Sequence, residues 1–175
     1  RPEKGTDVFV DAMLDVLPDF PDFTAVIAGL CQPQFDAFRD ELAQRIAARK
    51  LDGRIVFVGE IPSDEMPDWY ANVLITVASP RYEGYGLTVL EGMACGCAVV
   101  ASDTGAFRTI VDEGVTGHVV PTNDVDALVA ALRPLMQDTL RAQSMGQSGR
   151  RRVEAAFSIE KEAEGIAAVY ETVLK

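Results

Sequence analysis

The stretch that most restricts the fold of this chain is an apolar run followed by a glycine turn and a helix. Residues 73–78 are apolar and strand-like, Gly84 and Gly86 interrupt the chain, and residues 87–95 have a helical pattern. The first N–H groups of a helix have no partner within the helix and carry partial positive charge, and glycines let a phosphate approach the backbone closely. The sequence therefore predicts an anion site at this turn.

Short apolar runs alternate with amphipathic helical segments along the chain, which indicates a parallel sheet covered by helices on both faces. We therefore expect an α/β fold with a Rossmann-like, three-layer arrangement. Ligands bind such sheets at the carboxyl ends of strands, and the glycine turn lies at one of these ends. The expected strands cover 24–29, 54–58, 73–78, 98–101 and 117–120, and the expected helices cover 34–49, 63–72, 87–95, 105–111, 123–136, 139–156 and 158–174, after a first helix that Thr6 or Asp7 can cap.

Two glutamates flank the glycine turn, and their placement points to sugar hydroxyls. Glu83 precedes the turn, and Glu91 follows it by about one helical turn. A carboxylate beside a phosphate is electrostatically unfavourable unless it binds another group, and a sugar diol can donate two hydrogen bonds to it. Either glutamate alone is explained as a solvated residue or a partner of the helix dipole. Together with Gly84 and Gly86, they favour a site for a nucleotide sugar.

Composition limits the other possible functions. The chain has 175 residues, 48% of them hydrophobic, which is enough for one domain with a core. The net charge of -11 argues against nucleic-acid binding, which needs a basic face. The three cysteines, Cys31, Cys95 and Cys97, suit free thiols in a reducing compartment better than a disulfide framework. No apolar run approaches the ~18 residues of a membrane span, and we expect a cytoplasmic protein.

Two other motifs have ordinary structural explanations. Residues 124–126 (Asp-Val-Asp) match a metal-binding pattern, but they stand at a helix start, where capping by Asn123 or Asp124 explains them. His118 is the only histidine, and no serine or cysteine nucleophile motif accompanies it, so a catalytic triad is not expected. The sequence therefore predicts no metal site and no cofactor.

The order of the motifs resembles the C-terminal, donor-binding half of retaining glycosyltransferases of the GT-B fold, in the large family four (group 1 glycosyltransferases). The resemblance extends over essentially the whole chain, and Glu83 and Glu91 have the family's spacing of seven intervening residues. The matching motifs are PEKG at 2–5, VFVGEIP at 56–62, the stretch 83–91, MACG at 93–96, VVAS at 99–102 and GVTGHVVP at 114–121.

The resemblance implies a role for each matching position. Lys4 would pair with the donor diphosphate and stabilise it as a leaving group, and Glu83 would lie near the hydroxyls of the donor sugar; these are the expected catalytic residues. Glu91 would bind the ribose diol, and the backbone near Ile61 would lie against the base. The donor-binding turn would comprise Gly84, Tyr85, Gly86, Leu87 and Thr88, with phosphate oxygens held by the backbone of the last three.

The resemblance also implies an enzymatic function. The sequence of residues 79–88 most resembles that of bacterial mannosyltransferases of lipopolysaccharide core assembly. We therefore expect transfer of a hexose, with mannose from GDP-mannose favoured over a UDP-sugar, to a glycan or lipopolysaccharide core acceptor. The alternatives are a non-catalytic nucleotide-binding domain, a glucan synthase or a sugar-nucleotide epimerase.

The resemblance covers only one half of a GT-B enzyme. Residues 1–175 are expected to form the donor-binding domain, and the acceptor-binding N-terminal domain is absent from this chain. The family's phosphate-binding arginine and the strand before Lys4 also fall upstream of Arg1. We therefore expect a fragment that binds donor weakly and is inactive alone. We expect the full-length protein in the cytoplasm or at the cytoplasmic face of the inner membrane.

Overall fold

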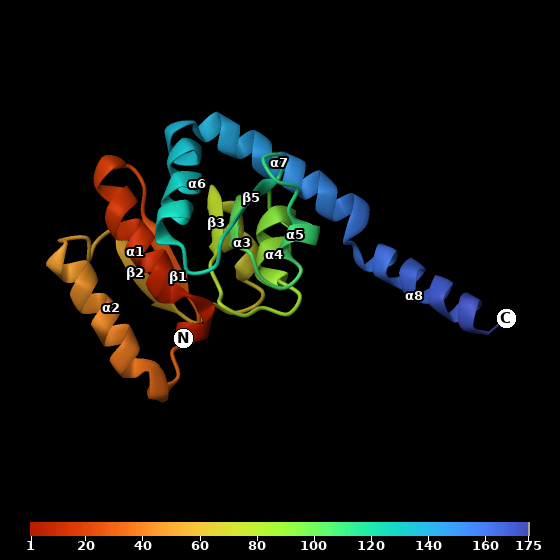
Figure 1. Ribbon diagram of the computed structural model, residues 1–175, viewed down its shortest axis with the longest axis horizontal. Helices are drawn as coiled ribbons and strands as arrows, with labels where there is room; N and C mark the ends of the chain where they lie inside the picture. The colour runs from red at the N-terminus through yellow and green to blue at the C-terminus, as the bar shows by residue number, and fades with distance from the viewer. Residues whose placement is uncertain (175) are drawn as a thin grey trace.

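The computed structural model describes residues 1–174, which form parallel strands covered by helices (Figure 1). This arrangement agrees with the predicted α/β fold. The strands are β1 (Ala25–Ala28), β2 (Ile55–Gly59), β3 (Ile75–Ala78), β4 (Ala98–Ser102) and β5 (Gly117–Val120). The helices are α1 (Thr6–Val16), α2 (Asp36–Ala48), α3 (Met66–Ala71), α4 (Leu87–Ala94), α5 (Phe107–Ile110), α6 (Val125–Gln137), α7 (Thr139–Ala156) and α8 (Ile159–Val173), with 3-10 turns η1 (Pro2–Lys4), η2 (Leu17–Asp19) and η3 (Pro33–Phe35).

The strands form two hydrogen-bonded sheets. Strands β1 and β2 pair in parallel, with Ala25 opposite Ile55. Strand β4 is the centre of a second parallel sheet, in which Val99 lies opposite Thr76 of β3 on one side and Gly117 of β5 on the other. Within residues 1–174 no backbone ladder joins β1 to β3, so the expected parallel sheet is in two parts.

Side-chain packing joins the two sheets. One hydrophobic core contains buried residues from α1, β1, β4 and α6, among them Val10, Ala25, Val100, Leu132 and Leu135. Burial of each large aliphatic side chain contributes about 1.5–3 kcal/mol relative to its exposure. The position of α1 is therefore set by packing against α6 and α2, within a core that also contains residues of both sheets.

A second core supports α4. Its buried members include Val89 and Met93 on α4, Val99 on β4, and Phe107 and Ile110 on α5. The apolar face of α4 thus packs onto the sheet, and the opposite face of the helix is exposed.

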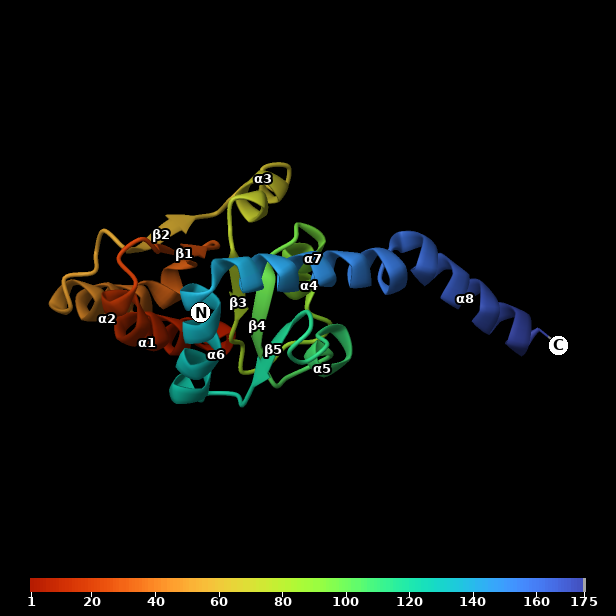
Figure 2. The same ribbon diagram turned by 90° about the horizontal axis from the view of Figure 1, so that it is seen from above.

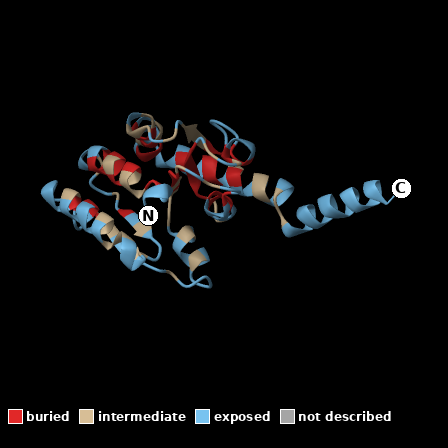
Figure 3. Cartoon of the chain, turned by 60° about the horizontal axis from the view of Figure 1, so that its bottom comes forward, coloured by how far each residue is buried: buried red, intermediate tan, exposed pale blue. Residues whose placement is uncertain are grey.

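The C-terminal helices lead away from the body of the domain. Helix α7 packs against α4 and β4, and α8 continues beyond it as a projecting arm (Figure 1, Figure 2). None of the residues of α8 is buried (Figure 3). No helix within residues 1–174 is both long enough and apolar enough to span a membrane.

Two local expectations are wrong. Neither Thr6 nor Asp7 caps the first helix, because Gly5 takes the N-cap position in a left-handed conformation (φ 64°) and Asp7 pairs with Arg81 instead. The third helix begins at Met66 and not near Ser63.

Candidate functional site

The predicted order of strand, glycine turn and helix is confirmed. Strand β3 leads into a loop that ends at Gly86, the N-cap of α4. Gly86 is buried with φ 99°, and a Cβ atom there would lie 2.3 Å from Cε1 of Phe107, so only glycine fits. No side chain caps α4. The N–H groups of the exposed residues Leu87 and Thr88 are therefore available to an anion.

The two predicted catalytic residues lie side by side. Lys4 ends the turn η1, and its Nζ donates a hydrogen bond of 3.0 Å to Oε2 of Glu83, although the residues are 79 positions apart. The other oxygen of Glu83, Oε1, accepts a 3.0 Å bond from the N–H of Gly84. Lys4 is thus connected through one carboxylate to the predicted donor-binding turn.

Glu91 lies on the exposed face of α4 and has a partner that sequence reasoning missed. The hydroxyl of Tyr70, on α3, donates a 3.2 Å hydrogen bond to Oε2 of Glu91. Burial of Tyr70, with a further effect of the Glu91 carboxylate, raises the pKa of the phenol well above its ordinary value. Tyr70 therefore stays protonated and remains a donor at neutral pH. No sequence motif marks Tyr70, because the bond joins two helices through their fold.

The other residues predicted to contact the donor lie in the loop before α4 and in the segment before α3. Tyr85 is exposed in the loop before α4, and Gly84 has no heavy atom within 4 Å of the position of a Cβ. Ile61 is half-buried in the segment that joins β2 to α3, the helix that carries Tyr70. Helix α3 contacts α4, and the segment that contains Ile61 therefore runs into the helix whose Tyr70 bonds to Glu91. Contact of Ile61 with a base stays a prediction.

A hollow of about 350 Å³ extends beside Lys4 at the carboxyl end of β1. Arg1, Lys4 and Arg39 contribute positive charge to its wall, and residues 27–32 contribute the end of β1 and the loop that follows. Ligands of parallel α/β sheets bind at this end of the strands. Of the predicted site residues, only Lys4 lines this hollow; Glu83, Glu91 and residues 84–88 do not.

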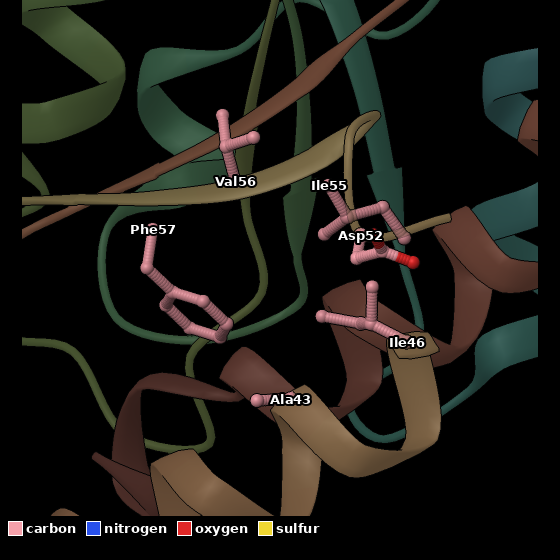
Figure 4. A pocket seen from close by; sticks show the side chains of 6 residues that line it. All are labelled: Ala43, Ile46, Asp52, Ile55, Val56 and Phe57. Carbon is pink, nitrogen blue, oxygen red and sulfur yellow. The ribbon is translucent and has the colours of Figure 1, made fainter. Parts of the chain in front are cut away.

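A second hollow, of about 300 Å³, lies between α2 and β2 and has different chemistry (Figure 4). Its lining is mainly apolar, with one carboxylate, and consists of Ala43, Ile46, Asp52, Ile55, Val56 and Phe57. None of the predicted site residues contributes to it.

The capping explanation of the Asp-Val-Asp motif is confirmed. Oδ1 of Asp124 accepts a 2.8 Å hydrogen bond from the N–H of Ala127 at the start of α6. Nδ1 of His118 lies 2.6 Å from Oε1 of Glu113. Among residues 1–174 no group of three or more His, Cys, Asp and Glu side chains is arranged to hold a metal ion.

Comparison with known proteins gives concordant matches. The profile of the family described as "Glycosyl transferases group 1" matches residues 1–152. The chain is 44% identical over 177 residues to the lipopolysaccharide core biosynthesis mannosyltransferase LpsB of Rhizobium meliloti (strain 1021), covering 100% of this chain and 50% of LpsB. It is 42% identical over 174 residues to the lipopolysaccharide core biosynthesis mannosyltransferase LpcC of Rhizobium leguminosarum bv. viciae, covering 99% and 49%. The chain spans about half the length of these curated relatives.

A solved structure matches the fold closely. The C-terminal domain of a glycosyl transferase group 1 family protein (LpcC) from Francisella tularensis superimposes with a TM-score of 0.87 and 34% sequence identity. The match covers 91% of this chain and 82% of that domain. It confirms the Rossmann-like fold class that the sequence predicted.

Proposed function

The chain belongs to the group 1 glycosyl transferases, and we propose from this that it is the donor-binding half of a GT-B mannosyltransferase. The donor is GDP-mannose, and the acceptor is a lipopolysaccharide core or related glycan. The names of the two rhizobial relatives support mannose as the sugar and a lipopolysaccharide core as the acceptor. The acceptor site belongs to an N-terminal domain of the same protein, and transfer needs both domains. The whole protein works in the cytoplasm or at the cytoplasmic face of the inner membrane.

The observation that carries this proposal is the link from Lys4 through Glu83 to the start of α4. Lys4 Nζ donates a hydrogen bond to Glu83, and Glu83 accepts one from the N–H of Gly84. Gly84 lies two residues before Gly86, the N-cap residue of α4, and no side chain caps this helix. An ammonium group has three N–H donors, so Lys4 can keep its bond to Glu83 and still donate to a phosphate oxygen. A cation and a helix N-terminus in one place suit a diphosphate.

This geometry explains how the chain would promote transfer. Breaking the bond between the anomeric carbon and the phosphate leaves negative charge on the departing diphosphate. Fixed N–H groups of Leu87 and Thr88, together with the Lys4 ammonium, would stabilise that charge without reorganisation, and no metal is required. Glu83 would orient the sugar hydroxyls beside the breaking bond, and Glu91, held by Tyr70, would accept the ribose diol.

Calorimetric titration of the chain with GDP, UDP and ADP tests the proposal. We expect all three to bind, with GDP bound most tightly. Failure of all three to bind would refute the donor site, whereas a preference for UDP would refute only the choice of GDP-mannose.

Substitution of Glu91 tests the orientation of the nucleotide. Glu91→Ala removes a charged acceptor beside the ribose, and the loss of one such hydrogen bond, worth about 1.5–3 kcal/mol, should lower GDP affinity by roughly 10–100-fold. The affinity for inorganic pyrophosphate, which has no ribose, should be unchanged. Glu154→Ala, at an exposed position on α7, is the matched control and should alter neither affinity. Equal losses for GDP and pyrophosphate in Glu91→Ala would show that Glu91 does not bind the ribose.

A further inference from the structure

The side chain of Arg81 makes several of the bonds that attach the segment carrying Lys4 to the loop before α4. The guanidinium forms a two-pronged ion pair with Asp7, with Nη1 at 2.8 Å from Oδ1 and Nη2 at 2.7 Å from Oδ2. Nη1 also donates to the carbonyl oxygen of Pro2, and the backbone N–H of Arg81 donates a 2.9 Å bond to the carbonyl oxygen of Glu3. Arg81 therefore bonds to the chain on both sides of Lys4.

A close backbone contact next to Lys4 reinforces this attachment. The hydroxyl of Ser79, which is buried, donates a 3.0 Å hydrogen bond to the carbonyl oxygen of Gly5. Gly5 has φ 64°, and a Cβ atom there would lie 1.8 Å from the carbonyl oxygen of Ser79. At Gly5, therefore, the two segments approach so closely that any side chain would collide with the backbone of Ser79.

The bond between Lys4 and Glu83 is too weak to provide this placement. The lysine side chain is 43% exposed, and exposed ion pairs contribute about 0–1 kcal/mol. Lysine is also a flexible point charge, whereas the planar fork of arginine fixes both distance and direction to a carboxylate. Glu83 is 22% exposed, and the Arg81 and Asp7 side chains are 34% and 26% exposed, so the main difference between the pairs is the freedom of the lysine. The two-pronged pair of Arg81 with Asp7 therefore adds to the bonds at Glu3 and Gly5 in fixing the backbone of Lys4.

We propose that Arg81 and Asp7 are positioning residues for donor binding, which act through Lys4 and do not touch the donor. This inference rests on the proposed donor site. The hydrogen bond from Arg81 lowers the pKa of Asp7 below its ordinary value, so the carboxylate stays charged in the range in which the enzyme would work. Substitution of Arg81 should shift Lys4 relative to α4 and weaken diphosphate binding.

An ion pair with only a structural role would affect stability but not diphosphate affinity, and the pair of Arg133 and Asp19 provides such a control. Arg133 bonds to Asp19 with Nη1 at 2.6 Å from Oδ2, and its side chain is 32% exposed, close to the value for Arg81. This pair also joins distant parts of the sequence, but neither residue lies at the candidate site. Because Asp19 is 59% exposed and Asp7 26%, Arg133→Lys should cost less stability than Arg81→Lys, and it should leave diphosphate affinity unchanged.

The test measures binding of inorganic pyrophosphate to the 175-residue chain by calorimetry, in a double-mutant cycle. Lys4→Ala and Arg81→Lys should each weaken binding by about tenfold, which corresponds to the loss of one charge-assisted hydrogen bond. Because Arg81 acts through Lys4, the double variant should bind no more weakly than Lys4→Ala alone. Asp7→Asn, which keeps the size of the side chain but removes its charge, should reproduce the effect of Arg81→Lys and replaces it if that variant does not fold.

Each result bears on the inference. Unchanged affinity in folded Arg81→Lys or Asp7→Asn would overturn it, as would additive losses in the double variant, which would mean that Arg81 contributes independently of Lys4. A tenfold loss in Arg133→Lys would show that general destabilisation explains the effect and would also overturn it. These outcomes leave the proposed function intact. If the unsubstituted chain binds neither pyrophosphate nor GDP, the proposed function fails and the positioning role fails with it.

Discussion

Replacement of Gly86 by alanine is the sharpest test of the donor-binding turn, because two independent features of the structure require glycine there. The residue has φ 99°, a conformation that disfavours any side chain, and an added Cβ would lie 2.3 Å from Cε1 and 2.8 Å from Cδ1 of Phe107. Phe107 is buried in the core below α4, so its ring has little room to move away.

The two features give separate contributions to the expected loss of stability. A left-handed conformation costs a non-glycine residue about 1–2 kcal/mol. Overpacking of a filled core by one methyl group adds about 1–3 kcal/mol. The free energy of unfolding should therefore fall by roughly 2–5 kcal/mol. Because domains are stable by about 5–15 kcal/mol, most of the variant should still fold. Its Tm should fall by roughly 4–20 °C, at about 2–4 °C per kcal/mol for a chain of this size.

Gly84→Ala is a control from the same loop. Gly84 does not have a positive φ, and no heavy atom lies within 4 Å of the position of its Cβ. Alanine there should change stability by less than about 1 kcal/mol, since a compatible Gly→Ala change acts mainly on the unfolded chain. Urea unfolding followed by circular dichroism measures both variants. Equal losses in the two variants, or a loss below about 1 kcal/mol in Gly86→Ala, would refute the assignment of a glycine-specific turn.

Three further predictions concern Tyr70, Asp7 and Asp124. Tyr70→Phe removes the bond to Glu91 and should weaken GDP binding by about 3–10-fold while pyrophosphate binding is unchanged; equal weakening of both would contradict a role on the ribose side. The folded pKa of Asp7 lies below its ordinary value of 3.8, so its stabilisation is fully present above that value and is lost as the pH falls through the lower, folded pKa. Urea unfolding between pH 5 and about pH 2 should therefore show a smaller loss for Asp7→Asn than for the unsubstituted chain, and parallel curves would contradict this. Asp124→Ala should lower the free energy of unfolding by about 1 kcal/mol, because it removes the cap of α6. GDP affinity should be the same in this variant as in the unsubstituted chain, and the same with Mg²⁺ as with EDTA. A change in GDP affinity in either comparison would support metal binding at residues 124–126.

Local features of the fold could be predicted because their causes lie within a few residues. Gly86 follows an apolar strand and precedes a helix, which is sufficient to predict the turn, and Asp124 stands directly before a helical pattern and caps it. The same reasoning was wrong for Asp7. A residue at a helix start can cap it, but Gly5 already holds the N-cap position and Arg81, 74 residues away, offers the carboxylate a stronger partner.

Pairings across the chain could not be predicted from periodicity. The alternation of strands and helices indicates parallel sheets, but it does not specify which strands bond to one another, so the separation of β1 and β2 from β3, β4 and β5 was not foreseen. The proximity of Lys4 and Glu83 was expected only from family resemblance, and Tyr70 was not found at all. Each of these contacts depends on how complete elements pack, which one-dimensional patterns do not encode.

The projecting helix α8 has a consequence for how the chain unfolds. An isolated helix of about 15 residues is marginal in water, and α8 has no buried side chain to stabilise it. Its amides are therefore protected from hydrogen exchange only by the local helix–coil equilibrium, whereas the amides of β4, whose five residues are all buried, exchange through much larger openings. Protection should fall sharply at Ser158, and this step would mark the end of the cooperative unit to which Lys4, Arg81 and α4 belong.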